Sequence, residues 1–145
     1  MKLSTSGANS INIFQLTAVF SMLFALIGFS YNVWRMEITE HNNNVRSAGF
    51  ELLLQLSELE SIIYAAHYDQ NVIEGSPRKG WVKVNLIADL SVVTNTQIQT
   101  AAEALKTSWQ HNWPHITDDE PRVTAMVAQI DNTRLKVRQL LSTLE

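Results

Sequence analysis

Residues 11–34, INIFQLTAVFSMLFALIGFSYNVW, form an uncharged and mostly apolar run near the amino terminus. Crossing the hydrocarbon core of a bilayer takes about 20 apolar helical residues, so this run is long enough to span a membrane. Residues 1–10 before it are a short polar tail in which Lys2 is the only charged side chain, and Arg35 follows it directly. We therefore predict a single transmembrane anchor at residues 11–34.

A cleaved signal peptide is the alternative interpretation of this run. Signal peptides combine a positive start, an apolar region of roughly 7–15 residues and small residues at a cleavage site. The run here is longer, and the residues that end it, FSYNVW, contain no A-x-A site. Tyr31 and Trp34 stand instead where aromatic rings meet the headgroups of a membrane. The sequence favours an uncleaved anchor.

The orientation of the anchor depends on few charges. Lys2 and the α-amine lie on one side, and Arg35 and Arg46 lie on the other, so the preference of positive charge for the cytoplasmic side nearly cancels. A tail of this length crosses a membrane less often than it stays inside. We therefore expect the amino terminus inside the cell and the rest of the chain outside.

Small side chains recur at helical spacing along one face of the anchor, at Thr17, Ser21, Ala25 and Gly28. Small residues let two membrane helices approach closely, because packing rather than water exclusion drives their association. Residues of this size are also common in membrane helices that have no such contact. The four positions are candidates for packing within the membrane, and both interpretations stay open.

The composition argues against several classes of function. The 145-residue chain has a net charge of −3 and no block of like charge, which disfavours nucleic acid as a partner. The absence of cysteine excludes disulfides, zinc–thiolate sites and thiol catalysis. None of the four histidines has a glutamate three residues before it, and there is no HExxH, G-x-S-x-G or glycine-rich phosphate-loop motif. We predict no catalytic activity, no cofactor and no metal site.

Beyond the anchor, the pattern predicts a polar stalk at 35–44 and a helical bundle at 45–145. The stalk contains three consecutive asparagines, which are poor helix formers, so a bend is expected there. A heptad stripe then marks a helix over 45–74, because alternating steps of three and four residues keep one helical face buried. Its members are Val45, Gly49, Leu52, Leu56, Leu59, Ile63, Ala66, Gln70 and Ile73, with Phe50, Leu53 and Tyr64 widening it.

Two further helices are expected, over 81–111 and 121–144. The segment Gly75–Gly80 contains Pro77 and ends the first helix, since glycine and proline stop helices. The middle of the second helix, around Ser91 to Thr96, is weak enough to allow a local irregularity. Pro114 ends that helix before Trp113, and Thr117, Asp118 or Asp119 then caps the third helix. The third stripe consists of Val123, Val127, Ile130, Arg134, Val137, Leu141 and Leu144, flanked by Met126 and Leu140.

These elements predict an all-α fold in which an antiparallel three-helix bundle follows the anchor. Residues 35–74 carry two basic and seven acidic side chains, whereas residues 122–145 carry four basic and two acidic ones. The opposite signs favour pairing of the first and third helices, although each exposed pair contributes only about 0.2–1 kcal/mol. In this arrangement the turn at Trp113 returns to the end of the bundle where Val45 and Gly49 lie.

Five side chains are candidates for an interaction surface. Tyr64, His67 and Tyr68 form the densest group of polar and aromatic side chains. Trp113 and His115 lie in a loop, where tryptophan often anchors an interface or meets the membrane surface. Trp113 has two expected roles: contact with headgroups or a neighbouring subunit, or closure of the bundle end over Val45 and Gly49.

Three runs carry a resemblance to other proteins: Ser30–Arg35 (SYNVWR), residues 51–60 (ELLLQLSELE) and residues 80–84 (GWVKV). They are similar to runs in uncharacterised single-pass membrane proteins of Gram-negative bacteria. The resemblance implies a protein of the bacterial inner membrane, and the orientation expected above then places the bundle in the periplasm. It brings no activity, cofactor or site residue with it.

Two functions are consistent with this sequence. The first is a non-enzymatic subunit whose bundle assembles with another membrane protein or with itself. The second is an extracytoplasmic bundle that senses a ligand and acts through a partner membrane protein, since the sequence shows no second membrane span and no output domain. A continuous dry core with an exposed apolar stripe would favour assembly, and a pocket with convergent polar groups would favour sensing.

Overall fold

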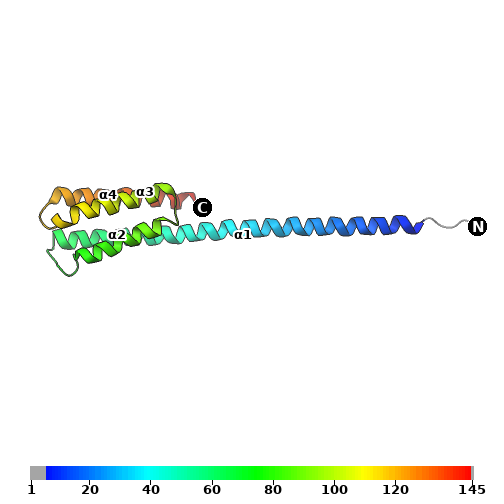
Figure 1. The fold of residues 1–145 in the computed structure, drawn as a ribbon, viewed down its shortest axis with the longest axis horizontal. Coiled ribbons are helices and arrows are strands. Elements are labelled where there is room, and N and C mark those ends of the chain that lie inside the picture. Colours follow the sequence, from blue (N-terminus) through cyan, green and yellow to red (C-terminus); the bar gives the residue numbers. More distant parts are fainter. Residues whose placement is uncertain (1–5, 145) are drawn as a thin grey trace, which may run out of the picture. The chain divides into compact units, whose positions relative to one another are not determined.

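The computed structural model describes the backbone of residues 6–144 and the side chains of residues 13–144. Within this part of the chain all regular structure is helical: α1 (Ser6–His67), α2 (Pro77–Ser91), α3 (Thr96–Asn112), a short 3-10 helix η1 (Trp113–His115) and α4 (Glu120–Thr143) (Figure 1). The chain divides into two compact units, Met1–His41 and Asn42–Glu145. The predicted all-α class is confirmed.

The first unit contains the apolar part of α1. Every side chain from 13 to 41 is exposed. An 18-residue window of this helix has a mean hydropathy of 2.0 and no buried residue, which makes α1 the one helix of the described chain that is long and apolar enough to cross a membrane. The hydroxyls of Thr17 and Thr39 donate to the carbonyls of Ile13 and Arg35, at 2.8 and 2.9 Å, so these polar groups are satisfied within the helix.

Helix α1 continues through the stalk into the second unit. Residues 35–44 are helical throughout, so the asparagine run does not interrupt the helix where the sequence suggests a bend. Asparagine costs only some tenths of a kcal/mol at an exposed helical position, and the following apolar stripe is well formed. Val45, Leu52, Leu56, Leu59, Ile63 and Ala66 are all buried, as the heptad predicts.

The carboxyl end of α1 differs from the prediction. The helix ends at His67 rather than at residue 74, and Gln70 adopts a left-handed conformation with φ of 50°. The side-chain oxygen of Asn71 accepts hydrogen bonds from the backbone N–H groups of Ile73 and Glu74 at 3.1 and 3.0 Å. This local turn replaces the last helical turns, and it leaves Gln70 and Ile73 exposed rather than in the core.

The single helix predicted over 81–111 is wrong, because the structure contains two helices in its place. Helix α2 begins at Pro77, whose fixed φ suits the first helical position, and it ends at Ser91. The hydroxyl of Ser91 donates to the Ala88 carbonyl at 2.6 Å, and that of Thr94 donates to the Ser91 carbonyl at 2.6 Å. Asn95 then caps α3 by accepting from the N–H of Ile98 at 3.0 Å. Side chains that bond to the local backbone thus turn the chain at 92–95.

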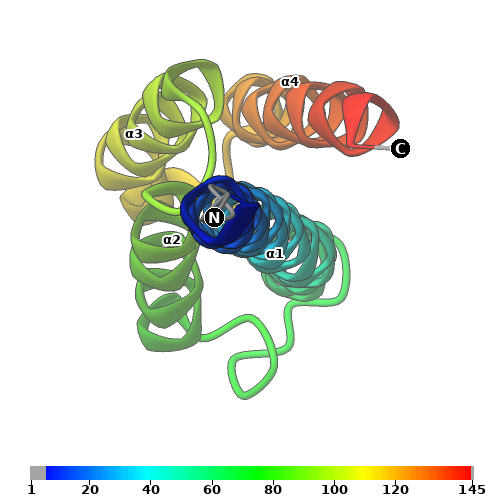
Figure 2. The same ribbon diagram turned by 90° about the vertical axis from the view of Figure 1, so that its right-hand side faces the viewer.

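The predicted three-helix arrangement is therefore not confirmed. Helices α2 and α3 lie side by side and run in opposite directions, and α4 reverses the direction again (Figures 1 and 2). Within the second unit, α1, α2, α3 and α4 follow one another around a common core. The largest fully buried side chains of this core are Trp109, Leu52, Leu56, Leu59, Ile63, Ile87, Ile98, Leu105, Met126, Ile130, Val84 and Val123.

The contact between α2 and α3 centres on Gly80 and Trp109. Trp109 is 1% exposed, and its six-membered ring lies where a Cβ on Gly80 would be. A glycine is needed at this position because the tryptophan ring approaches the α2 backbone directly. The last helix begins as expected, since Asp119 caps α4 by accepting from the N–H of Arg122 at 3.2 Å.

We predict that Gly80→Ala destabilises the bundle, although alanine is the better helix former by about 1 kcal/mol. The added methyl group collides with the Trp109 ring, and such overpacking costs about 1–3 kcal/mol. Chemical denaturation of the full chain measures the loss. Trp109→Phe removes the ring atoms that the methyl group meets. The Gly80→Ala/Trp109→Phe double variant should therefore lose less free energy of unfolding than the two single variants lose together. Additive losses would contradict the close α2–α3 contact.

Candidate interaction surface

The surface of the second unit carries an uncharged stripe along the solvent-facing side of α1. While one heptad of α1 is buried, a second series with the same alternating steps of three and four residues faces outward. We call it the α1 outer stripe, and it consists of Ser47, Phe50, Leu54, Ser57, Ser61 and Tyr64. All six residues are exposed, and Phe50, Leu54 and Tyr64 are 60%, 51% and 38% accessible.

Two acidic residues beside this stripe form ion pairs with the neighbouring helices, whereas Glu51, next to Phe50, accepts a hydrogen bond from the Gln55 amide of the same helix at 2.6 Å. On the α2 side, Glu58 pairs with Lys83. On the α4 side, Glu60 pairs with Arg134 at 2.5 Å, and these two side chains are only 21% and 15% exposed. Arg134 is the residue that interrupts the apolar stripe of the last helix. The opposite charges of the first and last helices thus meet in one well-defined pair.

Two exposed aliphatic side chains extend the apolar surface beyond α1. Leu135 of α4 is 55% exposed and lines a shallow groove between α1 and α4 together with Ser57, Glu60, Asp131, Arg134 and Arg138. Val82 of α2 is 62% exposed and lines a groove on the opposite flank. The α1 outer stripe therefore has a groove on each side.

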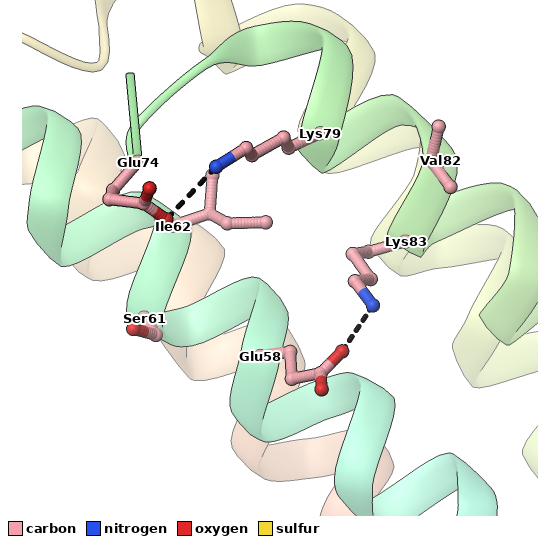
Figure 3. Close-up of a pocket in the computed structure, with 7 residues that line it drawn as sticks. All are labelled: Glu58, Ser61, Ile62, Glu74, Lys79, Val82 and Lys83. Atoms are coloured by element: carbon pink, nitrogen blue, oxygen red, sulfur yellow. Dashed lines mark hydrogen bonds and ion pairs between the residues drawn. The ribbon is translucent and has the colours of Figure 1, made fainter. Parts of the chain in front are cut away.

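The groove between α1 and α2 has a volume of about 350 Å³ and is shown in Figure 3. Lys79 and Lys83 reach across it from α2, and their ammonium groups meet Glu74, at 2.9 Å, and Glu58. The Lys83 ammonium group also donates to Oε1 of Gln55 at 2.8 Å. Ile62 and Val82 supply apolar lining. Two cations and two anions thus face a partly apolar groove.

Tyr64, His67 and Tyr68 lie together at the carboxyl end of α1. The ring of Tyr68 packs against the rings of Tyr64 and His67, with centroids 5.6 and 4.6 Å apart. The Tyr64 hydroxyl donates to the Glu60 carboxylate at 3.0 Å. Partial desolvation and this hydrogen bond raise the pKa of Tyr64 above its usual value, so the hydroxyl keeps its proton at neutral pH.

The other two predicted interaction residues lie at the same end of the bundle. Trp113 and His115 form η1 between α3 and α4, and Nδ1 of His67 is 2.8 Å from the carbonyl oxygen of Ile116. Trp113 is half-buried and packs against the core, whereas His115 is exposed. The structure thus brings all five predicted residues to one end of the bundle.

The predicted position of Trp113 over Val45 and Gly49 is wrong. Because the chain turns back at 92–95, α3 runs towards the carboxyl end of α1 and not towards Val45. A Cβ on Gly49 would meet the side chain of Leu141 in α4. Arg46, one helical turn earlier, donates to the carbonyl of Leu144 at 2.5 Å. The last turn of α4 therefore covers the end of the bundle that the sequence assigned to Trp113.

The start of α4 is stabilised by local electrostatics. Partial desolvation by itself would raise the pKa of Asp119, but the backbone and guanidinium hydrogen bonds from Arg122 hold that pKa below its usual value. The Arg122 side chain also donates to Asn112 Oδ1 at 3.3 Å, which ties α4 to the end of α3. These groups position the α3–α4 connection and offer no reactive arrangement.

The small residues of the predicted anchor lie in the first unit. Thr17, Ser21, Ala25 and Gly28 are exposed along α1, and a Cβ on Gly28 would meet no atom within 4 Å. Their role in membrane packing stays a prediction.

Sequence reasoning missed most of the α1 outer stripe. Phe50 and Tyr64 were expected to widen the buried stripe, yet both are exposed, and Leu54, Leu135 and Val82 were not considered. The signal was present, since the steps from Ser47 to Tyr64 repeat the heptad of the buried face. Among the described residues, no group of three or more His, Asp or Glu side chains is placed to hold a metal ion.

No protein-family model matches the chain, and neither a curated protein nor a solved structure gives a significant match.

Proposed function

We propose that this protein is a membrane-anchored helical-bundle subunit without catalytic activity, which assembles with another membrane protein or with a second copy. In this proposal, residues 11–34 anchor the chain in the bacterial inner membrane. The observation that carries the proposal is the combination of a closed apolar core with an uncharged, partly apolar stripe left on the surface of α1.

The interior of the bundle supports an assembly role. Its buried residues are almost all apolar, and the buried polar side chains of Gln55, Ser91 and Thr133 each form hydrogen bonds. The grooves described above lie on the surface, between helices. This core contributes packing.

The exterior supports the same role. Phe50 and Leu54 expose more than half of their side chains, and burying apolar area contributes about 25 cal/mol per Å². Aromatic residues are enriched in the central parts of interfaces, and charged residues are depleted there. The α1 outer stripe fits both preferences, because it carries two aromatic residues and no charged one.

We predict that the full chain in its native membrane is captured by amine-reactive crosslinking in complexes larger than its own 16.4 kDa. Phe50→Asp with Leu54→Asp should reduce this capture by roughly tenfold, since each lost anchor of an interface costs 1 kcal/mol or more. Val92→Asp with Val93→Asp is the matched control, because these valines are also exposed but lie in the α2–α3 turn. A chain that is captured only as a monomer would contradict the proposal.

The proposed orientation places the amino terminus in the cytoplasm and the bundle in the periplasm. It is supported by the short polar tail, in which Lys2 is the only charged side chain. We expect a reporter that is active only in the cytoplasm to be silent when it is fused after Glu145. An active reporter would reverse the orientation.

The α1–α2 groove favours a second candidate function, the sensing of a small zwitterionic ligand. The ligand's carboxylate would meet Lys79 and Lys83, and its ammonium group would meet Glu58 and Glu74 (Figure 3). Both lysines already have carboxylate partners, so a ligand must replace existing ion pairs, and this makes sensing the weaker candidate.

Thermal melting of the full chain with each of the twenty amino acids tests this candidate. A ligand at about 100 times its Kd would stabilise the fold by roughly 2.7 kcal/mol, and this raises the melting temperature by several degrees. Lys83→Met should abolish the shift, and Lys106→Met, on α3 outside this groove, should preserve it. If no amino acid raises the melting temperature, the sensing candidate fails.

A further inference from the structure

We propose that the α1 outer stripe pairs with the same stripe of a second copy, in a parallel two-fold contact between the two α1 helices. This inference rests on the proposed function and specifies its partner. It concerns only the part of α1 in the second unit, from Ser47 to Tyr64.

The spacing of the stripe is that of a coiled-coil seam. Its steps are three, four, three, four and three residues, which keep the same side of two helices in contact. The distance from Ser47 to Tyr64 is about 26 Å along the axis, at 1.5 Å per residue. Helix α1 thus has two heptad seams, and the fold of the chain itself covers only the inner one.

The residues along the stripe are suited to meeting their own copies. In a parallel two-fold contact each residue lies opposite itself, so large side chains meet at Phe50 and Leu54 and small ones at Ser57 and Ser61. The two serines allow the backbones to approach, and their hydroxyls can form hydrogen bonds across the axis. A shared anchoring segment inserts both copies across the membrane in the same direction, which favours a parallel contact.

The charges around the stripe also favour a second copy. A two-fold axis brings identical residues together, so an unpaired charge on it would repel its copy. The stripe itself carries no charge. Glu58 and Glu60, which flank it, are paired with Lys83 and Arg134 of the same chain. These pairs neutralise two of the acidic side chains of α1 where the two copies would meet, and the third, Glu51, accepts a hydrogen bond from Gln55 of the same helix. A lipid surface would instead require a basic face.

The size of the stripe indicates a weak contact that depends on the anchor. A strip about 26 Å long and about 10 Å wide is well below the roughly 800 Å² that each partner contributes to a standard interface. Leu135 and Val82 on the two flanks add apolar area. Tethering in one membrane raises the effective concentration to the millimolar range, which is sufficient for a contact of this size.

Disulfide crosslinking tests the contact, because the chain contains no cysteine of its own. Ser47→Cys, Ser57→Cys and Ser61→Cys are small changes at exposed positions, and each is made singly in the full chain in native membranes. After oxidation, all three should form disulfide dimers at least roughly tenfold above Thr107→Cys, an exposed control on α3. Adding Leu54→Lys to the Ser57→Cys variant should reduce its dimer at least roughly fivefold, whereas adding Val92→Lys should not.

Each outcome decides between the alternatives. Dimers from Ser57→Cys without dimers from Ser47→Cys would exclude the parallel arrangement, because only that arrangement brings both ends of the stripe to their own copies. Dimers no more abundant than those of Thr107→Cys would overturn the inference. If complexes with other proteins are still captured in that case, the proposed function stands with a different partner. If the chain is captured as a monomer as well, the proposed function fails too.

Discussion

Burial of one face of α1 is the constraint on which the second unit depends. Leu52, Leu56, Leu59 and Ile63 are fully buried, and they belong to the same hydrophobic cluster as the buried residues of α2, α3 and α4. An amphipathic helix of this length cannot leave such a stripe in water, because each buried aliphatic side chain contributes about 1.5–3 kcal/mol. The three shorter helices therefore supply the surface against which α1 packs.

The polar contacts around this core determine how the helices are aligned with one another. Glu60 with Arg134 joins α1 to α4, and Glu58 with Lys83 joins α1 to α2. Exposed ion pairs contribute little to stability, but the first of these is largely shielded from solvent and fixes one register between two helices. The same pairs neutralise Glu58 and Glu60 beside the outer face of α1, so packing and surface charge depend on the same residues.

The limits of the sequence are clearest at two places in the bundle. Between Ser91 and Thr96 a cluster of Ser, Thr and Asn marks a weak point in a helical pattern, but the pattern on both sides keeps the same heptad phase. Local hydrogen bonds from these side chains allow the chain to turn. The packing of Trp109 against Gly80 then holds α3 beside α2. The second place is the end of α1, where Asn71 forms a local turn that heptad counting ignores.

The outer stripe shows a related limit. The sequence pattern around Phe50 and Tyr64 would be the same if these residues faced a core, whereas they face solvent. Heptad spacing specifies which residues share a face, but the number of neighbouring helices specifies which faces are covered.

The sequence by itself determined the all-α class, the apolar run at 11–34, most of the buried heptad positions of the first and last helices, and a cap for the last helix among Thr117, Asp118 and Asp119. These follow from residue spacing and from hydrogen bonds within a short segment, and the sequence of that segment specifies both. Only the tertiary structure decided the reversal between α2 and α3, the placement of Trp113 beside the carboxyl end of α1 and the exposure of the α1 outer stripe. These depend on contacts between residues far apart in the chain, such as Gly80 with Trp109 and His67 with Ile116, whose free energy no local pattern contains.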